Sequence, residues 1–504
     1  MTEDRQAIWN QPIIFKKGQK GLKNAQIPEV PSEFLPFINS QKGKLSKLSR
    51  KSELSLPELG ELEVLRHYTR LSQMNFGVST GFYPLGSCTM KYNPLINDKI
   101  ASSHKIGLMH PDQPIETSQG CLQIIYELQE QIALLFGLDA ATVQPAAGAA
   151  GEYTGLLIIK AYHKKNGEDN QRREIIIPDS AHGTNFASAA MAGYTVVTIP
   201  SASDGTVDLE ALKVATGPQT AGFMLTNPST LGIFDRNIKE ITTIIHNAGG
   251  LCYYDGANLN AIVGISRPGD MFFDVAHSNL HKTFSTPHGG GGPGAGVVSV
   301  RKDLIPFLPK PIIAKKDGYY SLDYDRPESI GKVKAYFGNF GVLVRAYAYI
   351  HMMGWEGLQA AARHAVLNAN YLAHSVHKIK GFTIPYKDQK TGLIKHEFVA
   401  SAEMLKHETG ISALDISKRL LDFFMHPPTI YFPMIVPEAL MIEPTETETK
   451  ETLDNYIIAL KQISNESYSN PDIIKASPHN MSVGRIDDVQ AARKPILSER
   501  MRNK

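Results

Sequence analysis

Short apolar segments alternate with helical segments through the middle of this 504-residue chain, and this alternation is the feature that most constrains its fold. Helical patterns, for example at Leu209–Ala215 and Ile238–Asn247, separate several of the apolar segments. The segments predict strands at Ile175–Ile177, Thr195–Ile199, Gly222–Thr226, Leu251–Tyr254, Val275–Ser278 and Val297–Val300. Unbroken apolar strands that alternate with helices indicate an α/β fold built on a largely parallel, doubly wound sheet.

The first sixty residues differ from this region because they are basic and weakly patterned. Positive side chains gather there at Lys42, Lys44, Lys47, Arg50 and Lys51. Since a charge run is most often solvated, we interpret residues 1–60 as a solvated N-terminal basic arm. An arm that binds another subunit is the sharper alternative.

The rest of the chain divides where its pattern changes. Residues 61–340 hold the strand and helix alternation and predict a large α/β domain with a lead-in segment. Residues 341–369 read as a linking helix rich in Ala, Tyr and Met. Residues 370–504 mix a strand at Glu397–Ala400 with a helix at Ala413–Phe424, which is typical of a smaller α+β domain.

Composition excludes several classes of protein. The 52 Lys and Arg residues nearly balance the 50 Asp and Glu residues, so the chain is not built to coat nucleic acid or an anionic membrane. Its cysteines, Cys88, Cys121 and Cys252, are too few for a disulfide framework. No uncharged apolar run is long enough to span a bilayer, and the N-terminus lacks a signal-peptide core. We therefore expect a soluble, cytoplasmic protein.

An acid and a lysine follow two successive predicted strands. Asp255 ends one strand, and Lys282 follows the next, 27 positions later. In an open α/β sheet both strand ends lie at the carboxyl edge, where ligands bind. Pyridoxal phosphate requires such a pair: a lysine for the Schiff base, and a carboxylate that keeps the pyridine nitrogen protonated. Each residue alone is weak evidence, since Asp-Gly is usually a turn and a lone lysine is usually solvated.

Glycine is crowded just after this lysine, with six glycines between Gly289 and Gly296. Alone, the cluster is compatible with a flexible loop. It does not match a Walker A motif, because no GK[ST] follows, and Rossmann glycines belong at the first βα turn. Beside Lys282, the cluster indicates a backbone that approaches a bound cofactor without a Cβ clash.

Small residues before a predicted helix suggest a site for the cofactor phosphate. We expect a helix from Glu152 to His163, and the free N–H groups and dipole at a helix N-terminus favour an anion. The residues just before this helix are Ala147, Gly148 and Ala149. Without Lys282, close helix packing would be the favoured explanation of these small residues.

Two loops at other strand ends carry polar side chains. His182 follows the Ile175–Ile177 strand and is placed to stack on the cofactor ring, with Thr184 nearby as a donor. Asn227 follows a later strand and is placed to donate to the phenolic oxygen of the ring. A loop histidine is more often structural, and Asn-Pro is an ordinary turn signal, so both roles depend on Lys282.

Metal and serine-nucleophile chemistry find no support in the sequence. The 17 histidines form no HExxH motif and no Cys/His cluster at zinc spacing. A GxSxG nucleophile elbow is absent as well. We therefore predict no metal site.

Several long strings resemble the glycine decarboxylase family, the P-protein of the glycine cleavage system, in the form that is split into two chains. The match is to the family's second subunit. The strings are Tyr83–Pro94, Asp255–Asn258, Asn279–Gly294, His426–Pro433 and Glu438–Glu446. They are specific because they are long and widely spread, and they cover the basic arm least.

This resemblance implies a pyridoxal phosphate enzyme of fold type I, the aspartate-aminotransferase type, with a large and a small domain. Lys282 would hold the cofactor covalently, Asp255 would pair with its pyridine nitrogen, and His182 would stack on its ring. The phosphate would be cradled in part by Ala147, Gly148 and Ala149.

The implied activity is decarboxylation of glycine, with release of CO2 and transfer of the aminomethyl group to the lipoyl arm of H-protein. The implied partners are P-protein subunit 1, in a heterotetramer of two copies of each chain, lipoylated H-protein and, through the system, T-protein and L-protein. A noncatalytic scaffold is one alternative, which the presence of Lys282 disfavours. Another fold type I enzyme acting on a small amino acid, hydroxymethyltransferase-like or desulfurase-like, is the other.

Residues near the lysine leave some roles open. Many enzymes of this class place a phosphate-binding serine three positions before the lysine, but here that position is Asn279 and the serine is Ser278. His281 is a candidate proton carrier because imidazole titrates near neutrality. Cys88 is chemically able to exchange with a lipoyl disulfide, but a small buried residue in a turn is the favoured interpretation.

Overall fold

The computed structural model describes residues 7–22, 28–44, 46–48, 50–52, 56–288, 294–498 and 501. They form two compact units, one of residues 78–475 and one in which residues 1–77 join residues 476–504. Of the predicted glycine cluster, Gly289 to Gly292 lie outside the described residues, so their approach to a cofactor stays a prediction.

The centre of the larger unit is a seven-stranded sheet in the order β1-β7-β6-β5-β4-β2-β3. Its strands are β1 (Ala140–Thr142), β2 (Glu174–Pro178), β3 (Thr195–Ile199), β4 (Thr220–Thr226), β5 (Leu251–Gly256), β6 (Val275–Asn279) and β7 (Gly296–Val300). Among these strands only β7 runs against its neighbours. The predicted largely parallel sheet is therefore confirmed, and the three-residue β1 is the strand that the sequence pattern missed.

Helices cover both faces of this sheet. Neighbouring residues of one strand, such as Tyr253 and Tyr254, belong to two different hydrophobic clusters because successive side chains point to opposite faces. One cluster includes residues of α6 (Gly148–Lys165) and α7 (Gly183–Met191). The other includes residues of α5 (Gln119–Phe136), α8 (Leu209–Ala215), α9 (Ile238–Asn247) and α11 (Phe340–Val376). This arrangement is the doubly wound α/β fold that was expected.

Helix α6 begins at Gly148, four residues before the predicted start at Glu152. The residues of its first turn are small and show no apolar periodicity, so the sequence pattern did not predict that turn as helix. They are small because the helix lies directly on the sheet. A Cβ atom at Gly148 would come within 2.3 Å of Asn279 Nδ2, and one at Gly155 within 2.3 Å of Tyr253 Cε2.

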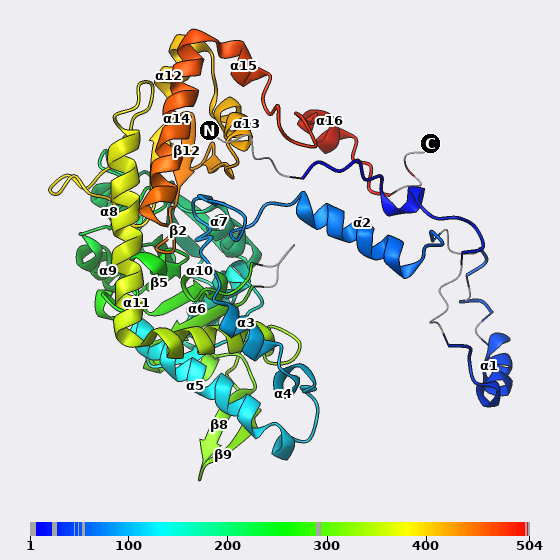
Figure 1. Ribbon diagram of the computed structural model, residues 1–504. Helices are drawn as coiled ribbons and strands as arrows, with labels where there is room; N and C mark the ends of the chain where they lie inside the picture. The colour runs from blue at the N-terminus through cyan, green and yellow to red at the C-terminus, as the bar shows by residue number, and fades with distance from the viewer. Residues whose placement is uncertain are drawn as a thin grey trace. The chain divides into compact units, whose positions relative to one another are not determined.

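A second, antiparallel sheet follows in the order β10-β12-β11. Its strands are β10 (Phe398–Ser401), β11 (Thr429–Ile430) and β12 (Ala439–Ile442), and its helices are α12 (Glu403–Thr409), α13 (Ala413–Asp422), α14 (Lys450–Ser469) and α15 (Pro471–Lys475). These elements share a core with the second half of α11, which lies alongside α14 (Figure 1). The predicted strand and the predicted helix at 413–424 are confirmed, each with one or two residues of difference at an end.

Shorter elements complete the larger unit. They are α3 (Leu95–Ala101), α4 (His104–Gly107), α10 (Leu280–Thr283), the hairpin of β8 (Ile312–Lys316) and β9 (Tyr319–Asp323), and 3-10 turns at Ile115–Thr117, Leu259–Ala261, Pro268–Met271 and Lys302–Phe307. Of these, α10 carries Lys282 directly after β6.

The smaller unit contains α1 (Leu35–Lys42), α2 (Glu61–Gln73), α16 (Asp488–Arg493) and 3-10 turns at Ile14–Lys16 and Ser32–Phe34. Residues near the N-terminus pack on α2: the Trp9 ring lies under Arg70 at 4.7 Å, and its Nε1 donates to Gln73 at 2.8 Å. The five basic residues of the predicted arm are exposed. In the described part of the chain, no helix has both the length and the apolar character needed to cross a membrane.

Candidate active site

Two adjacent parallel strands bring the predicted acid and lysine to one edge of the large sheet. Asp255 lies at the end of β5 and pairs in register with His277 of β6. Lys282 lies in the single turn α10 that follows β6, and its side chain is half-buried. The charge of Lys282 acts on the Asp255 carboxylate. Both groups therefore face the carboxyl edge, where a ligand of this fold binds.

Asp255 is buried, with 1% of its surface exposed, and it is well supplied with donors. Its Oδ2 accepts hydrogen bonds from Asn185 Nδ2 at 2.9 Å and from Thr226 Oγ1 at 3.2 Å, and its Oδ1 accepts from the Ala257 amide at 2.9 Å. Burial alone would raise its pKa, but the interaction with His277 and the hydrogen bonds from Asn185 and Ala257 lower the pKa overall. The carboxylate therefore stays ionised at neutral pH.

His277 and Asn185 are the functional residues that sequence reasoning missed. The Nε2 atom of His277 lies 3.4 Å from Asp255 Oδ1, and its Nδ1 is hydrogen-bonded to the Tyr253 hydroxyl at 2.8 Å. The available signal was a histidine inside an otherwise apolar, fully buried strand, which needs polar partners. Asn185 gave no such signal, because its partner lies 70 positions away.

The N-terminus of α6 forms a cradle of the kind expected for a phosphate. Ala147 is the N-cap and has no side-chain cap, and the first amide used inside the helix is that of Gly151, which donates to the Ala147 carbonyl. The amides of Gly148 and Ala149 make no hydrogen bond to a described residue. An 18-residue helix thus presents free N–H groups and the positive end of its dipole.

Asn279, and not Ser278, faces this cradle. The two residues point to opposite faces of β6, as successive strand residues do. The Asn279 side chain lies against Gly148, and its buried Oδ1 has no partner among the described residues. Ser278 Oγ instead donates to the Gly256 carbonyl at 3.1 Å inside the sheet. The geometry thus favours Asn279 where the sequence left two candidates.

His182 and Thr184 lie together at the start of α7. His182 is the N-cap, its Nδ1 is hydrogen-bonded to Thr184 Oγ1 at 2.8 Å, and its ring meets Phe432 edge-on at 5.6 Å. The Thr184 hydroxyl also donates to Glu152 Oε1 at 2.8 Å. Since this hydroxyl is already engaged, Thr184 orients His182 and Glu152 in the structure.

Asn227 is fully buried just past the end of β4. Its Oδ1 accepts from the Asp235 amide at 2.9 Å, while its Nδ2 has no partner in the described part of the chain. A buried amide group with a free donor is costly unless a ligand uses it. This orphaned donor is what a phenolic oxygen beside Asp255 would need.

His281 and Cys88 are the two remaining titratable candidates from the sequence. Burial, together with the charges of His288 and Lys282, lowers the pKa of His281 to about 3, so this imidazole is neutral at neutral pH. Its Nδ1 accepts from the Ala295 amide at 3.3 Å. Burial raises the pKa of Cys88 to about 11, so its thiol stays protonated. Neither group titrates near neutrality here.

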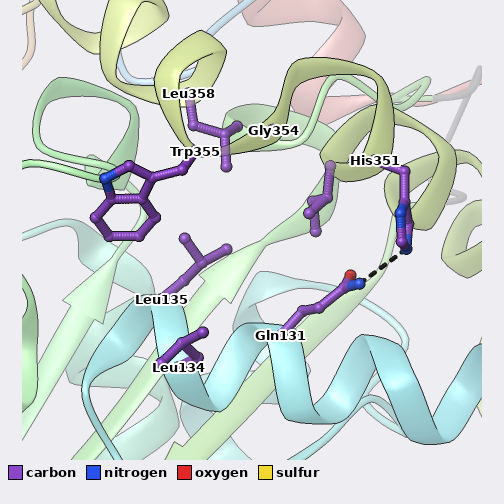
Figure 2. Close-up of a pocket in the computed structure, with 8 residues that line it drawn as sticks. Gln131, Leu134, Leu135, His351, Gly354, Trp355 and Leu358 are labelled. Atoms are coloured by element: carbon purple, nitrogen blue, oxygen red, sulfur yellow. Dashed lines mark hydrogen bonds between the residues drawn. The ribbon is translucent and has the colours of Figure 1, made fainter.

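An apolar pocket of about 240 Å³ lies between α5 and α11, where α11 breaks at Gly354 (Figure 2). Its two polar side chains, Gln131 and His351, are hydrogen-bonded to each other at 2.9 Å. Its lining holds no lysine and no acid. The pocket therefore lacks the chemistry found at the carboxyl edge.

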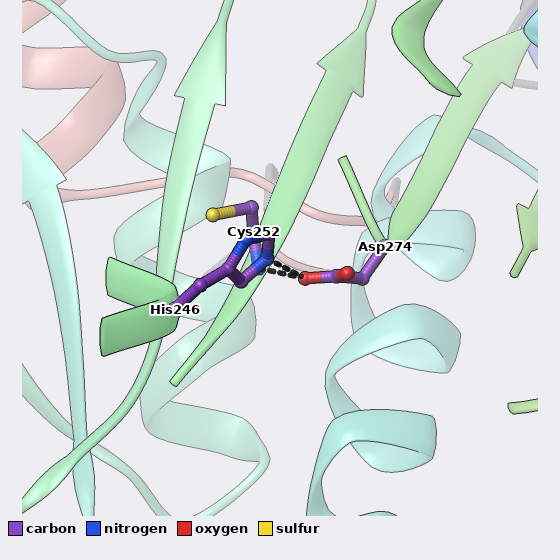
Figure 3. Close-up of side chains that lie close together, drawn as sticks. All are labelled: His246, Cys252 and Asp274. Atoms are coloured by element: carbon purple, nitrogen blue, oxygen red, sulfur yellow. Dashed lines mark hydrogen bonds and ion pairs between the residues drawn. The ribbon is translucent and has the colours of Figure 1, made fainter. Parts of the chain in front are cut away.

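Three side chains with metal-binding atoms meet near the start of β6: His246, Cys252 and Asp274 (Figure 3). Asp274 Oδ2 is hydrogen-bonded to His246 Nε2 at 2.8 Å and to the Cys252 amide at 2.6 Å. The other carboxylate oxygen, Oδ1, accepts a hydrogen bond from the Arg301 guanidinium. Burial raises the pKa of the Cys252 thiol well above its ordinary value. These contacts serve to hold neighbouring strands, and they give a metal ion no free thiolate.

The residues at the carboxyl edge fit pyridoxal phosphate. A cradle that a Cβ atom would fill lies at the N-terminus of α6, an ionised carboxylate lies at the end of β5, and a buried amide with an unpaired donor and a lysine follow the neighbouring strands β4 and β6. The fold and the site together are those of the pyridoxal phosphate-dependent enzymes of fold type I.

Solved structures share this fold. A glycine decarboxylase (P-protein) of the glycine cleavage system, solved with an inhibitor, matches with a TM-score of 0.72 and 20% identity over 86% of this chain and 99% of its own. A sphingosine-1-phosphate lyase from Burkholderia pseudomallei matches with a TM-score of 0.61 and 13% identity over 86% and 97%.

The sequence matches are more specific. Residues 36–318 match the glycine cleavage system P-protein model, and residues 361–479 match the glycine dehydrogenase C-terminal domain. A probable glycine dehydrogenase (decarboxylating) subunit 2 of Pyrococcus furiosus is 57% identical over 99% of this chain and 97% of its own. The same-named chain of Listeria monocytogenes is 53% identical over 96% and 97%. The chain belongs to the glycine cleavage system P-protein family.

Proposed function

We propose that this chain is the catalytic second subunit of a glycine dehydrogenase (decarboxylating). With pyridoxal phosphate it removes CO2 from glycine and passes the aminomethyl group to the lipoyl arm of H-protein. The observation that carries the proposal is that Lys282 and the ionised Asp255 lie at the same carboxyl edge, at the ends of two adjacent strands, in a chain that matches relatives of that name over 99% of its length.

Lys282 and Asp255 act at two positions of the cofactor, its aldehyde carbon and its ring nitrogen. Lys282 binds the cofactor covalently, and Asp255 keeps a proton on the ring nitrogen. His277, Asn185 and Thr226 keep Asp255 ionised and oriented. Pyridoxal phosphate, when bound, accepts the electron pair that is left as CO2 departs.

The remaining site residues bind and orient the cofactor. The free amides of Gly148 and Ala149 receive the phosphate at the N-terminus of α6, with Ala147 as the cap and Asn279 beside them. The unpaired Asn227 Nδ2 would donate to the phenolic oxygen of the cofactor. His182 would stack on the cofactor ring, and Thr184 orients His182.

The name of the relatives implies a partner chain, and we propose subunit 1 in a heterotetramer of two copies of each. Lipoylated H-protein is the second substrate, and T-protein and L-protein act on its product. We also propose a cytoplasmic location, and the division into an arm, a large domain, a linking helix and a small domain given above.

The deciding experiment is exchange of 14C-bicarbonate into glycine by this chain with its partner subunit and H-protein. We expect exchange, and its loss in Lys282→Ala, whose visible absorbance from lysine-bound cofactor should also vanish. Lys165→Ala is the matched control, because Lys165 has 52% of its side chain exposed and should leave both signals unchanged. Turnover of serine without glycine–bicarbonate exchange would refute the proposal and favour another enzyme of the same fold.

A further inference from the structure

Two buried carboxyl groups that the proposed reaction has not used lie at the end of the small sheet. Glu397 precedes β10 and Glu443 follows β12, and these strands pair antiparallel from Phe398 opposite Ile442. The two glutamates are therefore the next pair in register. Their exposed fractions are 0% and 1%, and a carboxylate oxygen of each lies within 4.8 Å of the other.

Both glutamates hold one short segment of distant chain, Gly86–Thr89, which we call the Cys88 loop. Glu397 Oε2 accepts from the Ser87 amide at 2.7 Å. Glu443 accepts from the Thr89 amide at 2.8 Å and from its hydroxyl at 2.5 Å. Ser87 and Thr89 both have positive φ angles, of 64° and 49°, which side-chain-bearing residues rarely adopt. The three hydrogen bonds to the buried carboxyl groups offset this strain.

Lys282 is a positive charge that acts on both carboxyl groups. Its charge lowers the pKa of Glu397 and of Glu443, and it acts on Cys88 between them. Burial lowers the pKa of His396 to about 3 and also lowers that of His288, so neither imidazole adds a positive charge at neutral pH. Glu446 is paired with Lys91 at 2.8 Å, and its negative charge also raises the pKa of Glu443.

Two adjacent buried carboxylates with one facing cation cannot both stay ionised. Burial, followed by the repulsion from Glu443, raises the pKa of Glu397 well above its ordinary value, and burial also raises that of Glu443. Repulsion between like charges in a dry site leaves one proton on such a pair.

We propose that Glu397 and Glu443 share one proton and so act as a single negative charge that faces Lys282 and holds the Cys88 loop. They are positioning residues, which act through Lys282 and do not touch the substrate. The single charge stabilises a positive nitrogen at Lys282, both in the free amine and in its covalent link to the cofactor. This inference rests on the proposed function only in taking Lys282 as the cofactor lysine.

The test is the pH at which the visible absorbance of the cofactor-loaded protein changes, as the nitrogen of Lys282 loses its proton. It compares wild type, Glu397→Gln, Glu443→Gln and the double variant. Either single change leaves one carboxylate, so the midpoint should stay close to that of wild type. The double change removes the charge and should lower the midpoint by about one pH unit or more. Glu448→Gln is the control, since Glu448 is a partly buried carboxyl outside this cluster with a pKa of about 7.

Additive shifts from the two single variants would mean two independent charges, and an unchanged midpoint in the double variant would mean none. Either result overturns the shared proton. If the double variant does not fold, unfolding of the single variants decides instead. A raised carboxyl pKa makes the free energy of unfolding of the wild type fall as pH rises above the ordinary glutamate pKa, and this fall should be absent in each single variant. A fall with pH as large as that of wild type would refute the pairing. Persistence of the absorbance in Lys282→Ala would instead refute the proposed function.

Discussion

Replacing Gly148 by alanine should weaken the binding of pyridoxal phosphate while leaving the chain folded. The new Cβ atom would lie 2.3 Å from Asn279 Nδ2 and 2.9 Å from its Cγ, so the Asn279 side chain must move away from the helix end. Overpacking of this kind costs about 1–3 kcal/mol. Alanine in place of a helical glycine returns about 1 kcal/mol, so the free energy of unfolding should fall by no more than about 2 kcal/mol.

The effect on the cofactor should be larger and specific for its phosphate. The displaced Asn279 side chain would lose its hydrogen bond to the phosphate, and a hydrogen bond to a charged group contributes about 1.5–3 kcal/mol. This loss should raise the dissociation constant of pyridoxal phosphate about 10- to 100-fold. The assay is titration of the apo-protein, followed by visible absorbance, in parallel with pyridoxal, which has no phosphate.

Gly120→Ala is the matched control, because Gly120 lies near the N-terminus of α5 with open space at its Cβ position. It should bind the cofactor like wild type. Wild-type affinity for pyridoxal phosphate in Gly148→Ala, or an equal loss of affinity for pyridoxal, would show that the end of α6 does not hold the phosphate.

Three further outcomes are expected. The pKa of Asp255 is lowered in the folded protein, so its contribution to stability is present above the ordinary aspartate pKa and is lost as pH falls through the lowered value. Asp255→Asn should therefore flatten this part of an acid-unfolding curve and reduce exchange activity. An acid-unfolding curve identical to that of wild type would contradict the assignment. Lys91→Met should cost about 3–5 kcal/mol in urea unfolding, because it leaves Glu446 buried without its partner, whereas the exposed Lys99→Met should cost little. Alkylation of Cys88 by iodoacetamide should keep rising up to about pH 11; a plateau near pH 9 would show an ordinary thiol.

The fold was largely predictable because its signals are local. Unbroken apolar runs such as Ile175–Ile177 need only their own residues to be recognised as buried strands. The failures also have local causes: β1 is only three residues long, and the first turn of α6 is made of small residues without periodicity. Their size makes sense only beside the sheet residues that they touch.

The candidate site was predictable to a smaller extent. Asp255 ends one identifiable strand and Lys282 follows the next, so chain order alone put them at one edge. The choice of Asn279 over Ser278 required knowing which face of β6 meets α6. The neutral state of His281 required its burial beside Lys282, which no spacing reveals.

The sequence by itself determined the layered α/β architecture and the family, and it supplied the lysine and the acid that we propose for the cofactor site, because periodicity, strand order and long family strings lie in consecutive residues. Only the tertiary structure decided how these groups are charged and held. The contact between Ser87 and Glu397 joins residues 310 positions apart, and the one between Thr89 and Glu443 joins residues 354 apart. Burial and distance set the proton occupancy of such groups, and both come into existence only when distant segments pack together.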